Sequence, residues 1–380
     1  GNSRSESGVS DLYLGFKIAL TPQECWLPEM AIIPQMNVPI GSGAFTSGEV
    51  EPGLNWIYSW EISDFISTAG STQGNRRLED SGSQLRCTTC SRDFPVIGEI
   101  PRFVPKENYA ESFGLQWNRF ANTQIDSKVG TTRSEVRFRE ETLWGEKELA
   151  GKLVLDAGCG SGRFSEIALK LGASLIAVDY SSAVDASKQN LSAPNKLIVQ
   201  GDLAALPVLD QTFDFIYCIG VLQHTSEPAR IVKELLRCLK IGGEITLTFY
   251  ENSSWHVLWY SKYVVRPLTK RLPKTLLLKI IERTSSLWFP LTSFLFSLPR
   301  NLSRIFRFLI PIANYVEYKY TNPKIARDEA ILDTFDMLSP SYDKPIKKSE
   351  IHSWVADSGT TVQGLPEKPI HGTMRFKRVS

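Results

Sequence analysis

The sequence predicts an α/β fold built on a doubly wound, mostly parallel sheet. Four apolar stretches, residues 153–157, 174–179, 196–200 and 212–219, are separated by helix-forming or polar segments. The first stretch runs directly into a glycine-rich turn. Strands that alternate with helices in this way are typical of βαβ units, and βαβ units build parallel sheets.

The glycine-rich turn is the most informative feature of the chain. Gly158, Gly160 and Gly162 occupy alternate positions after the first strand, and Asp156 stands just before them. Glycine permits positive φ and lets a ligand approach the backbone, and the N-terminus of the helix that follows favours a bound nucleotide-type group. A dinucleotide site has the spacing G-x-G-x-x-G, and Asp156 would repel a pyrophosphate. The turn therefore predicts a cofactor that carries an ammonium group.

Two further strands of the predicted sheet also end in a carboxylate. Asp179, followed by Tyr180, ends the second strand, and Asp202 follows the third. The carboxyl ends of parallel strands lie at one edge of a sheet, where ligands of open α/β folds bind. An acidic residue about twenty positions after the glycines suits the hydroxyl groups of a ribose.

These segments resemble the class I S-adenosylmethionine-dependent methyltransferases, in particular the group that contains the ubiquinone and menaquinone biosynthesis enzymes. The matching motifs are VLDAGCGSGRFS, AVDYS, GDLAALP, FDFIYCIGVLQHTSEP and LLRCLKIGGEITLTFYE, within residues 153–251. The resemblance implies a seven-stranded Rossmann-like sheet that is completed by an antiparallel pair near residues 360–365 and 372–379. It also implies that S-adenosylmethionine is the cofactor. The implied contacts are Asp156, Gly158 and Gly160 for the methionine end, Asp179 with Tyr180 for the ribose, Asp202 and Leu203 for the adenine, and Ile219 and Gly220 along the cofactor.

We expect five segments in the chain. Residues 1–82 are rich in Ser, Gly and Pro and show no sustained hydrophobic period, which predicts poor structure. The others are a partial ribbon-like segment (83–108), a helical lid (109–150), the cofactor domain (151–251 and 341–380) and a helical insert (252–340).

The 83–108 segment resembles half of a zinc ribbon. It contains Cys87 and Cys90, whereas structural zinc takes four ligands. Cys25 stands alone and no histidine is close in the sequence. The incomplete ligand set argues against zinc, and a ribbon that folds without metal is the favoured interpretation.

The 109–150 segment has two amphipathic stretches. In the resembled family such a segment covers the cofactor and excludes water. The residues that would face cofactor or substrate are Tyr109, Gln116, Trp117 and Arg119. The alternative, that these side chains only anchor the helices on the core, carries equal weight.

His224, just after the fourth strand, is the candidate proton acceptor. A neutral imidazole accepts a proton near pH 7, and a base is needed only when the acceptor must lose a proton. The competing role is a structural hydrogen bond to a loop carbonyl, which the sequence favours slightly. Tyr250, at the end of the fifth strand, borders the same predicted pocket.

The insert combines apolar, aromatic and basic residues on short predicted helices. Ten basic residues lie between Lys262 and Arg307, and Glu282 is the single acidic residue there. Such helices are typical of membrane interfaces, and we expect residues 255–310 to contact a membrane surface or to hold a lipid-linked acceptor. A helical cap that packs its apolar faces on itself is the slightly favoured alternative.

Composition excludes few function classes. The net charge of +2 provides no general attraction for nucleic acid, and no apolar run is long enough to span a bilayer. We therefore expect a cytoplasmic enzyme, in part peripheral to the inner face of the membrane, that methylates a small-molecule or lipid-linked acceptor on oxygen or carbon. An RNA methyltransferase and a catalytically silent cofactor-binding scaffold are the alternatives.

Overall fold

The computed structural model describes most of the chain and divides it into two compact units. One unit contains residues 1–79 and 86–92, and the other residues 80–85 and 93–380. The described residues are 12–15, 18–21, 29–38, 51–59, 78–80, 84–87, 92–105, 108–252, 261–318, 320, 322–366 and 372–380.

The first unit contains an antiparallel sheet. Strand β3 (Glu29–Val38) pairs with three other strands, namely β1 (Leu12–Gly15), β2 (Ile18–Thr21) and β4 (Glu51–Ser59). The sequence predicts poor structure for residues 1–82, whereas these described residues are extended and paired.

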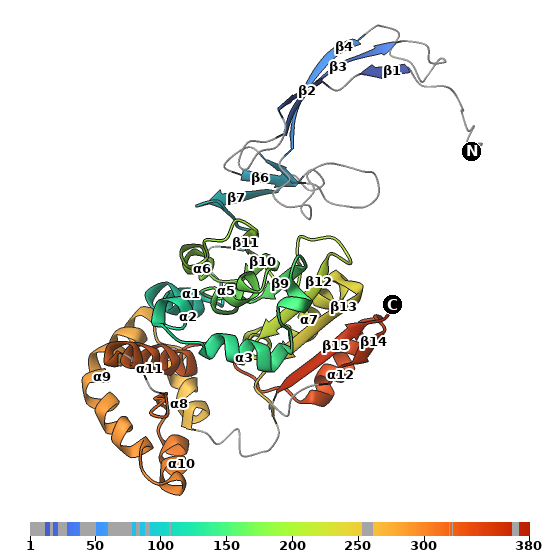
Figure 1. Ribbon diagram of the computed structural model, residues 1–380. Helices are drawn as coiled ribbons and strands as arrows, with labels where there is room; N and C mark the ends of the chain where they lie inside the picture. The colour runs from blue at the N-terminus through green and yellow to red at the C-terminus, as the bar shows by residue number, and fades with distance from the viewer. Residues whose placement is uncertain are drawn as a thin grey trace, which may run out of the picture. The chain divides into compact units, whose positions relative to one another are not determined.

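The second unit is built on a seven-stranded sheet, which confirms the predicted fold class (Figure 1). Its spatial order is β11-β10-β9-β12-β13-β15-β14. The first five strands in this order are parallel, and β15 runs antiparallel to both of its neighbours. The strands are β9 (Leu153–Ala157), β10 (Ser174–Asp179), β11 (Lys196–Gln200), β12 (Phe213–Ile219), β13 (Leu239–Thr248), β14 (Val362–Gly364) and β15 (Thr373–Arg378).

The order of the strands places a ligand site between β9 and β12. The chain winds from β9 outward through β10 to β11 and then crosses back to β12 on the other side of β9. Ligands of doubly wound sheets bind at the carboxyl ends of the strands at such a switch point. All five residues of β9 are buried, as expected for the central strand of a sheet covered on both faces.

Helices follow the strands and cover the sheet. The helices within the cofactor domain are α5 (Arg163–Lys170), α6 (Val184–Asn190), α7 (Pro228–Cys238) and α12 (Lys348–Ala356). Before β9 the chain forms α1 (Glu111–Arg119), α2 (Asp126–Val129), α3 (Arg133–Thr142) and α4 (Glu146–Leu149). The predicted helices at 109–144 therefore exist.

The described part of the insert is helical (Figure 1). Its helices are α8 (Ser261–Thr269), α9 (Lys274–Phe296), α10 (Arg300–Leu309) and α11 (Pro323–Leu338). Helices α9 and α11 pack against α1. A small apolar core joins α9 and α11 to Phe120, with Leu277, Ile281, Leu332 and Phe335 buried in it. Residues 253–260, which include the aromatic run noted in the sequence, lie outside the described part.

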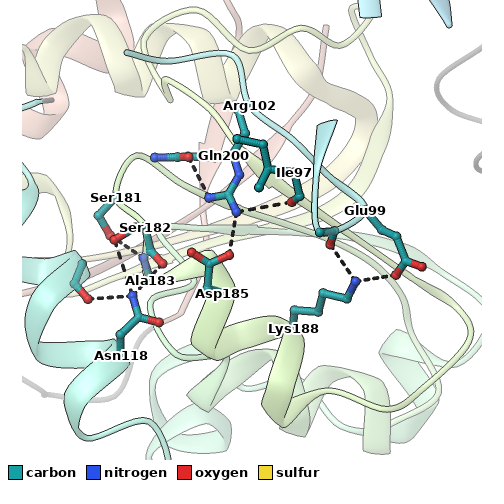
Figure 2. A network of polar contacts seen from close by, with 12 residues as sticks. Ile97, Glu99, Arg102, Asn118, Ser181, Ser182, Ala183, Asp185, Lys188 and Gln200 are labelled. Carbon is teal, nitrogen blue, oxygen red and sulfur yellow. Dashed lines mark hydrogen bonds and ion pairs between the residues drawn. The ribbon is translucent and has the colours of Figure 1, made fainter. Parts of the chain in front are cut away.

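Residues 93–103 extend the sheet at its β11 edge. Strands β7 (Asp93–Ile97) and β8 (Ile100–Pro101) pair with each other, and Arg102 bridges to Gln200. The buried Arg102 side chain donates to Asp185 on α6 at 2.5 Å and to Gln200 at 2.9 Å (Figure 2). The buried contacts of Arg102 thereby fasten this segment to the cofactor domain. Lys188 adds an exposed contact, since it donates to the carbonyl of Gly98 in the turn between β7 and β8 at 2.6 Å. Strands β5 (Leu78–Asp80) and β6 (Gln84–Cys87) precede this segment in the chain.

Candidate functional site

A cavity of about 690 Å³ lies at the carboxyl ends of the central strands. The glycine turn after β9, the end of β10 and the segment after β12 form one side of it, whereas α1, α3 and α11 form the other. Its size falls in the range of small-molecule and cofactor sites. The predicted cofactor-binding edge and the predicted substrate segments therefore share one cavity.

The glycine turn adopts the backbone conformations that require glycine. The φ angles are +93° at Gly158, +54° at Gly160 and +89° at Gly162. A Cβ on Gly158 would lie 2.3 Å from a methyl carbon of Val221, and one on Gly160 would lie 3.1 Å from the indole nitrogen of Trp117. Both Gly158 and Gly160 line the cavity, so the turn offers backbone to a ligand at close range.

Asp179 links the glycine turn to the end of β10. Its carboxylate accepts hydrogen bonds from the backbone N–H of Gly160 at 2.9 Å and of Ser181 at 2.8 Å, and from the Ser181 hydroxyl at 2.6 Å. Burial raises its pKa, and these hydrogen bonds oppose the rise. The carboxylate lines the cavity and is held in a fixed position there, as the predicted ribose contact requires.

Tyr180, the other predicted ribose contact, also lines the cavity. So do the residues predicted to contact the adenine and the length of the cofactor, namely Asp202, Leu203, Ile219 and Gly220. Tyr180 stacks on Tyr109 with ring centroids 4.8 Å apart. Asp202 accepts from the backbone N–H of Ala204 at 2.8 Å, which orients its carboxylate. The structure therefore brings these residues together although they come from three separate βα connections.

Asp156 is not on the cavity wall, in contrast to its predicted contact with the methionine amine. Its side chain is buried and accepts from the Ser165 hydroxyl on α5 at 2.6 Å. Burial raises its pKa to about 7, although the hydrogen bond from Ser165 opposes the rise. The side chain ties β9 to α5 beneath the glycine turn, and in this structure it supports the turn from behind.

Three of the four predicted lid residues line the cavity, and Arg119 does not. Tyr109, Gln116 and Trp117 face it, and the buried Gln116 amide donates to Asp336 on α11 at 3.0 Å. Arg119 is exposed and forms an ion pair with Glu282 on α9 at 3.0 Å. Positions 116 and 119 lie one turn apart on α1, but Arg119 points to the insert instead of the cavity.

His224 lines the cavity and also makes a loop contact. Its Nδ1 lies 3.1 Å from the carbonyl oxygen of Tyr342, and its ring packs between those of Phe113 and Tyr250. A carbonyl oxygen only accepts, so Nδ1 carries the proton and Nε2 of the neutral ring remains an acceptor. The loop contact that competes with catalysis in the sequence interpretation is thus present. Tyr250 also lines the cavity, as predicted.

A polar wall formed by side chains of α3, α5 and α11 also lines the cavity. It contains Arg133, Arg137 and Arg163, three carboxyls from α11, and Tyr315 and Tyr318. The polar and acidic character of residues 331–343 predicts that they line a pocket, and Asp333 and Asp336 do so, whereas the arginines were not predicted. Arg163 follows the last glycine of the turn directly, yet an arginine at a helix start is ordinary in sequence and gave no signal.

The predicted metal ligands are only partly within the described residues. Cys87 is a buried residue at the end of β6. Cys90 and Cys25 lie outside the described residues. Among the residues that the structure describes, no group of three or more His, Cys, Asp or Glu side chains is arranged to hold a metal ion.

Residues 155–247 match the family model "Methyltransferase domain", and residues 1–84 match the model "Putative MetA-pathway of phenol degradation". The first match covers the strands and turns that build the cofactor side of the cavity. This part of the chain is therefore similar to a methyltransferase domain.

Curated relatives agree with this family. Over 216 residues the chain is 27% identical to an uncharacterized chloroplastic methyltransferase of Arabidopsis thaliana. This match covers 49% of the chain and 59% of the relative. The chain is 34% identical to the demethylmenaquinone methyltransferase of Thermobifida fusca, covering 33% and 55% of the two chains, and 34% identical to a ubiquinone biosynthesis O-methyltransferase of Coxiella burnetii, covering 26% and 43%. The chain thus spans about half the length of the curated relatives that it matches.

Proposed function

We propose that this protein is an S-adenosylmethionine-dependent methyltransferase that acts on a small-molecule or lipid-linked acceptor. One observation carries the proposal. The glycine turn, Asp179 and Asp202 converge on one side of a single cavity, inside a domain that matches a methyltransferase family.

The residues on that side fit the cofactor. Gly158 and Gly160 line the cavity and carry no side chain, so a ligand can approach their peptide groups closely. Asp179 and Asp202 present carboxylates to a ligand that has ribose hydroxyls, an amine and a positively charged sulfur. Leu203 and Ile219 add apolar surface suited to an adenine ring.

The chain's contribution to methyl transfer is alignment and exclusion of water. S-adenosylmethionine, when bound, supplies a methyl group that is already activated on a sulfonium. The glycine turn and Asp179 would fix the cofactor, while Trp117 and Tyr109 cover it from α1 and the turn before that helix. Holding two reactants in line supplies a large share of catalysis in reactions of this type.

The relatives support a small-molecule acceptor, since two of them are named for quinone biosynthesis. The acceptor would occupy the part of the cavity between α3 and α11, opposite the glycine turn. His224 and Tyr250 border this part and remain candidates for contact with the acceptor.

Calorimetry with S-adenosylhomocysteine tests the cofactor site. We expect binding by the wild-type chain and an affinity about 10- to 100-fold lower for Asp179→Ala, because a hydrogen bond to a charged group contributes about 1.5–3 kcal/mol. Asp210→Ala is the control, since that side chain is 71% exposed and pairs with Arg237 outside the cavity. Wild-type chain that fails to bind, or equal affinity of the two variants, would refute the proposal.

We further propose that the insert rests on an anionic membrane surface. On α9, Leu276, Ile280, Leu287, Leu291 and Phe294 are exposed and recur at helical spacing along one face. Leu302, Ile305 and Leu309 form a similar exposed stripe on α10. The exposed basic residues around them are Lys270, Arg271, Lys279, Arg283, Arg300 and Arg304. This combination favours an interfacial location.

Several other charges of the insert are engaged within the protein. Arg266 is buried and pairs with Asp343, and Glu282 pairs with Arg119. The exposed face therefore carries a positive charge that no acidic side chain of α9 or α10 offsets. Within the described residues, no helix is both long and apolar enough to cross a bilayer.

Sedimentation with liposomes tests the membrane contact. We expect the wild-type chain to bind vesicles that contain anionic lipid at low salt. The double variant Leu287→Asp/Phe294→Asp should lose this binding, because the two side chains are 75% and 66% exposed. Ile241→Asp is the control, because Ile241 is an exposed apolar residue on β13. No sedimentation of the wild-type chain, or equal sedimentation of the variant, would exclude this surface.

A further inference from the structure

Helix α11 presents three carboxyl groups to the cavity. Glu329, Asp333 and Asp336 are spaced four and three residues apart, so they lie on one face of the helix, and all three line the cavity. They stand opposite the glycine turn, on the side where the proposed function places the methyl acceptor.

Two of the three carboxyls are already engaged by strong partners. Glu329 forms an ion pair with Arg133 at 2.7 Å. Asp336 accepts from the amide of Gln116, which is fully buried. Both side chains therefore act mainly in holding α11 against α1 and α3.

Asp333 differs from Glu329, because within the described residues no lysine or arginine lies within ion-pair distance of it. It accepts from the Gln124 amide at 3.2 Å and from the phenol of Tyr315, whereas Asp336 accepts from the Gln116 amide. Arg163, whose charge acts on Asp333, donates instead to Ser134 at 2.9 Å and to Gln124 at 2.8 Å. Asp333 is thus a cavity carboxyl held in place by neutral donors.

The surroundings of Asp333 favour a proton on it near neutral pH. Burial, together with the charges of Glu329 and Asp336, raises its pKa to about 7. A carboxyl that titrates near the working pH can take a proton from a substrate and release it again. The charged and titratable groups that act on it or respond to it are Glu329, Asp336, Tyr315, Arg163, Arg137 and Tyr250.

The charge balance of this wall favours a neutral acceptor over a cationic one. Arg133, Arg137 and Arg163 line this part of the cavity together with a fourth carboxyl, that of Glu140 on α3. When Asp333 carries its proton, the carboxylates of Glu140, Glu329 and Asp336 balance the three arginines, so the formal charges cancel. An ammonium group would gain little from a wall without net negative charge. A hydroxyl group needs only one acceptor oxygen at hydrogen-bond distance.

We propose that Asp333 binds a hydroxyl group of the methyl acceptor and takes its proton, so that the acceptor is a hydroxyl-bearing small molecule. The proposal rests on the proposed function. The O–H bond of the acceptor breaks, its electron pair stays on the acceptor oxygen, and the proton forms a bond to a carboxylate oxygen of Asp333. The acceptor oxygen is then the nucleophile, and solvent later receives the proton from Asp333. His224 on this account orients the ring that carries the hydroxyl.

Binding of simple probes tests the proposal without turnover. Catechol, 1,2-dimethoxybenzene and benzylamine are titrated calorimetrically into the full chain saturated with S-adenosylhomocysteine, at pH 6 to 8. We expect catechol to bind about tenfold or more tightly than dimethoxybenzene, which lacks a hydroxyl donor. Its affinity rises with pH, because the ionised carboxylate is the better acceptor.

Variants assign the effect to one side chain. Asp333→Asn is expected to lose both the preference for catechol and its pH dependence, whereas Asp333→Glu keeps them in part. Asp328→Asn, on the same helix but outside the cavity lining, is the control and behaves as wild type. Unchanged affinity for S-adenosylhomocysteine in each variant shows that the cofactor site is intact.

Three results would overturn the proposal while leaving the proposed function standing. They are equal binding of catechol and dimethoxybenzene, tighter binding of benzylamine than of catechol, and a pH dependence that persists in Asp333→Asn but disappears in His224→Gln. Failure of the wild-type chain to bind S-adenosylhomocysteine would instead contradict the proposed function.

Discussion

Substitution of Gly158 by alanine tests how strictly the backbone of the turn depends on glycine. The φ angle of +93° lies in a region that L-residues rarely adopt. A Cβ there would lie 2.3 Å and 2.8 Å from the two methyl carbons of Val221, closer than non-bonded carbons approach. Val221 lies in the segment after β12, so the strain would fall on two of the segments that form the cofactor side of the cavity.

The expected loss of stability is the sum of two parts. A non-glycine residue in the left-handed region costs about 1–2 kcal/mol. Forcing an extra methyl group against a packed side chain costs about 1–3 kcal/mol. Gly158→Ala should therefore lower the free energy of unfolding by about 2–5 kcal/mol.

Gly151→Ala separates the two parts. Gly151 has a φ of +70°, and a Cβ there would meet no atom within 4 Å, so only the conformational part of about 1–2 kcal/mol applies. Urea unfolding followed by tryptophan fluorescence measures all variants. Adding Val221→Ala to Gly158→Ala should recover part of the steric share. If Gly158→Ala is as stable as Gly151→Ala, the close approach to Val221 is not as described.

Two further substitutions test buried side chains outside the cavity, those of Arg102 and Asp156. Arg102→Ala removes a buried side chain that contacts Asp185 and Gln200, and urea unfolding should show a loss of about 1–3 kcal/mol, whereas Lys188→Ala, an exposed pair with Glu99, should show no measurable loss. Equal effects would contradict the assigned role of Arg102. Asp156→Asn tests the raised pKa of Asp156, about 7. The folded state holds this proton more tightly than the unfolded state, so wild-type stability should fall as pH rises from about 4 through 7, and the variant should lack that share of the decline. Parallel stability profiles of the two proteins would show that Asp156 is not buried as described.

The strands and the cofactor edge follow from local patterns in the sequence. The apolar stretches at 153–157 and 174–179 coincide with β9 and β10, because buried parallel strands need continuous apolar residues. Gly158 and Gly160 could be placed in the site because glycine at positive φ leaves a local signature. Asp179 could be placed because it directly ends a strand.

The direction of single side chains could not be predicted. Asp156 is the last residue but one of the strand that leads into the turn, yet its carboxyl turns to Ser165 on α5, because a strand sends successive side chains to opposite faces. Arg119 turns to Glu282, a partner 163 residues away in the chain. Both outcomes depend on the packing of elements that no local pattern specifies.

The arrangement of the polar wall was the largest part of the site that the sequence did not predict. Asp333 approaches Gln124, which lies 209 residues before it in the sequence, only because the insert folds back onto the helices before β9. The sequence shows that α11 is acidic but does not show which face of it turns inward.

A crystal structure of the chain with S-adenosylhomocysteine tests the central claim most directly. We predict density for the ligand in the cavity, with its amino-acid end against Gly158 and Gly160, its ribose hydroxyls on Asp179 and its adenine beside Leu203. Density at another place, or a ligand in the cavity that makes no contact with Asp179 and the glycine turn, would contradict the account.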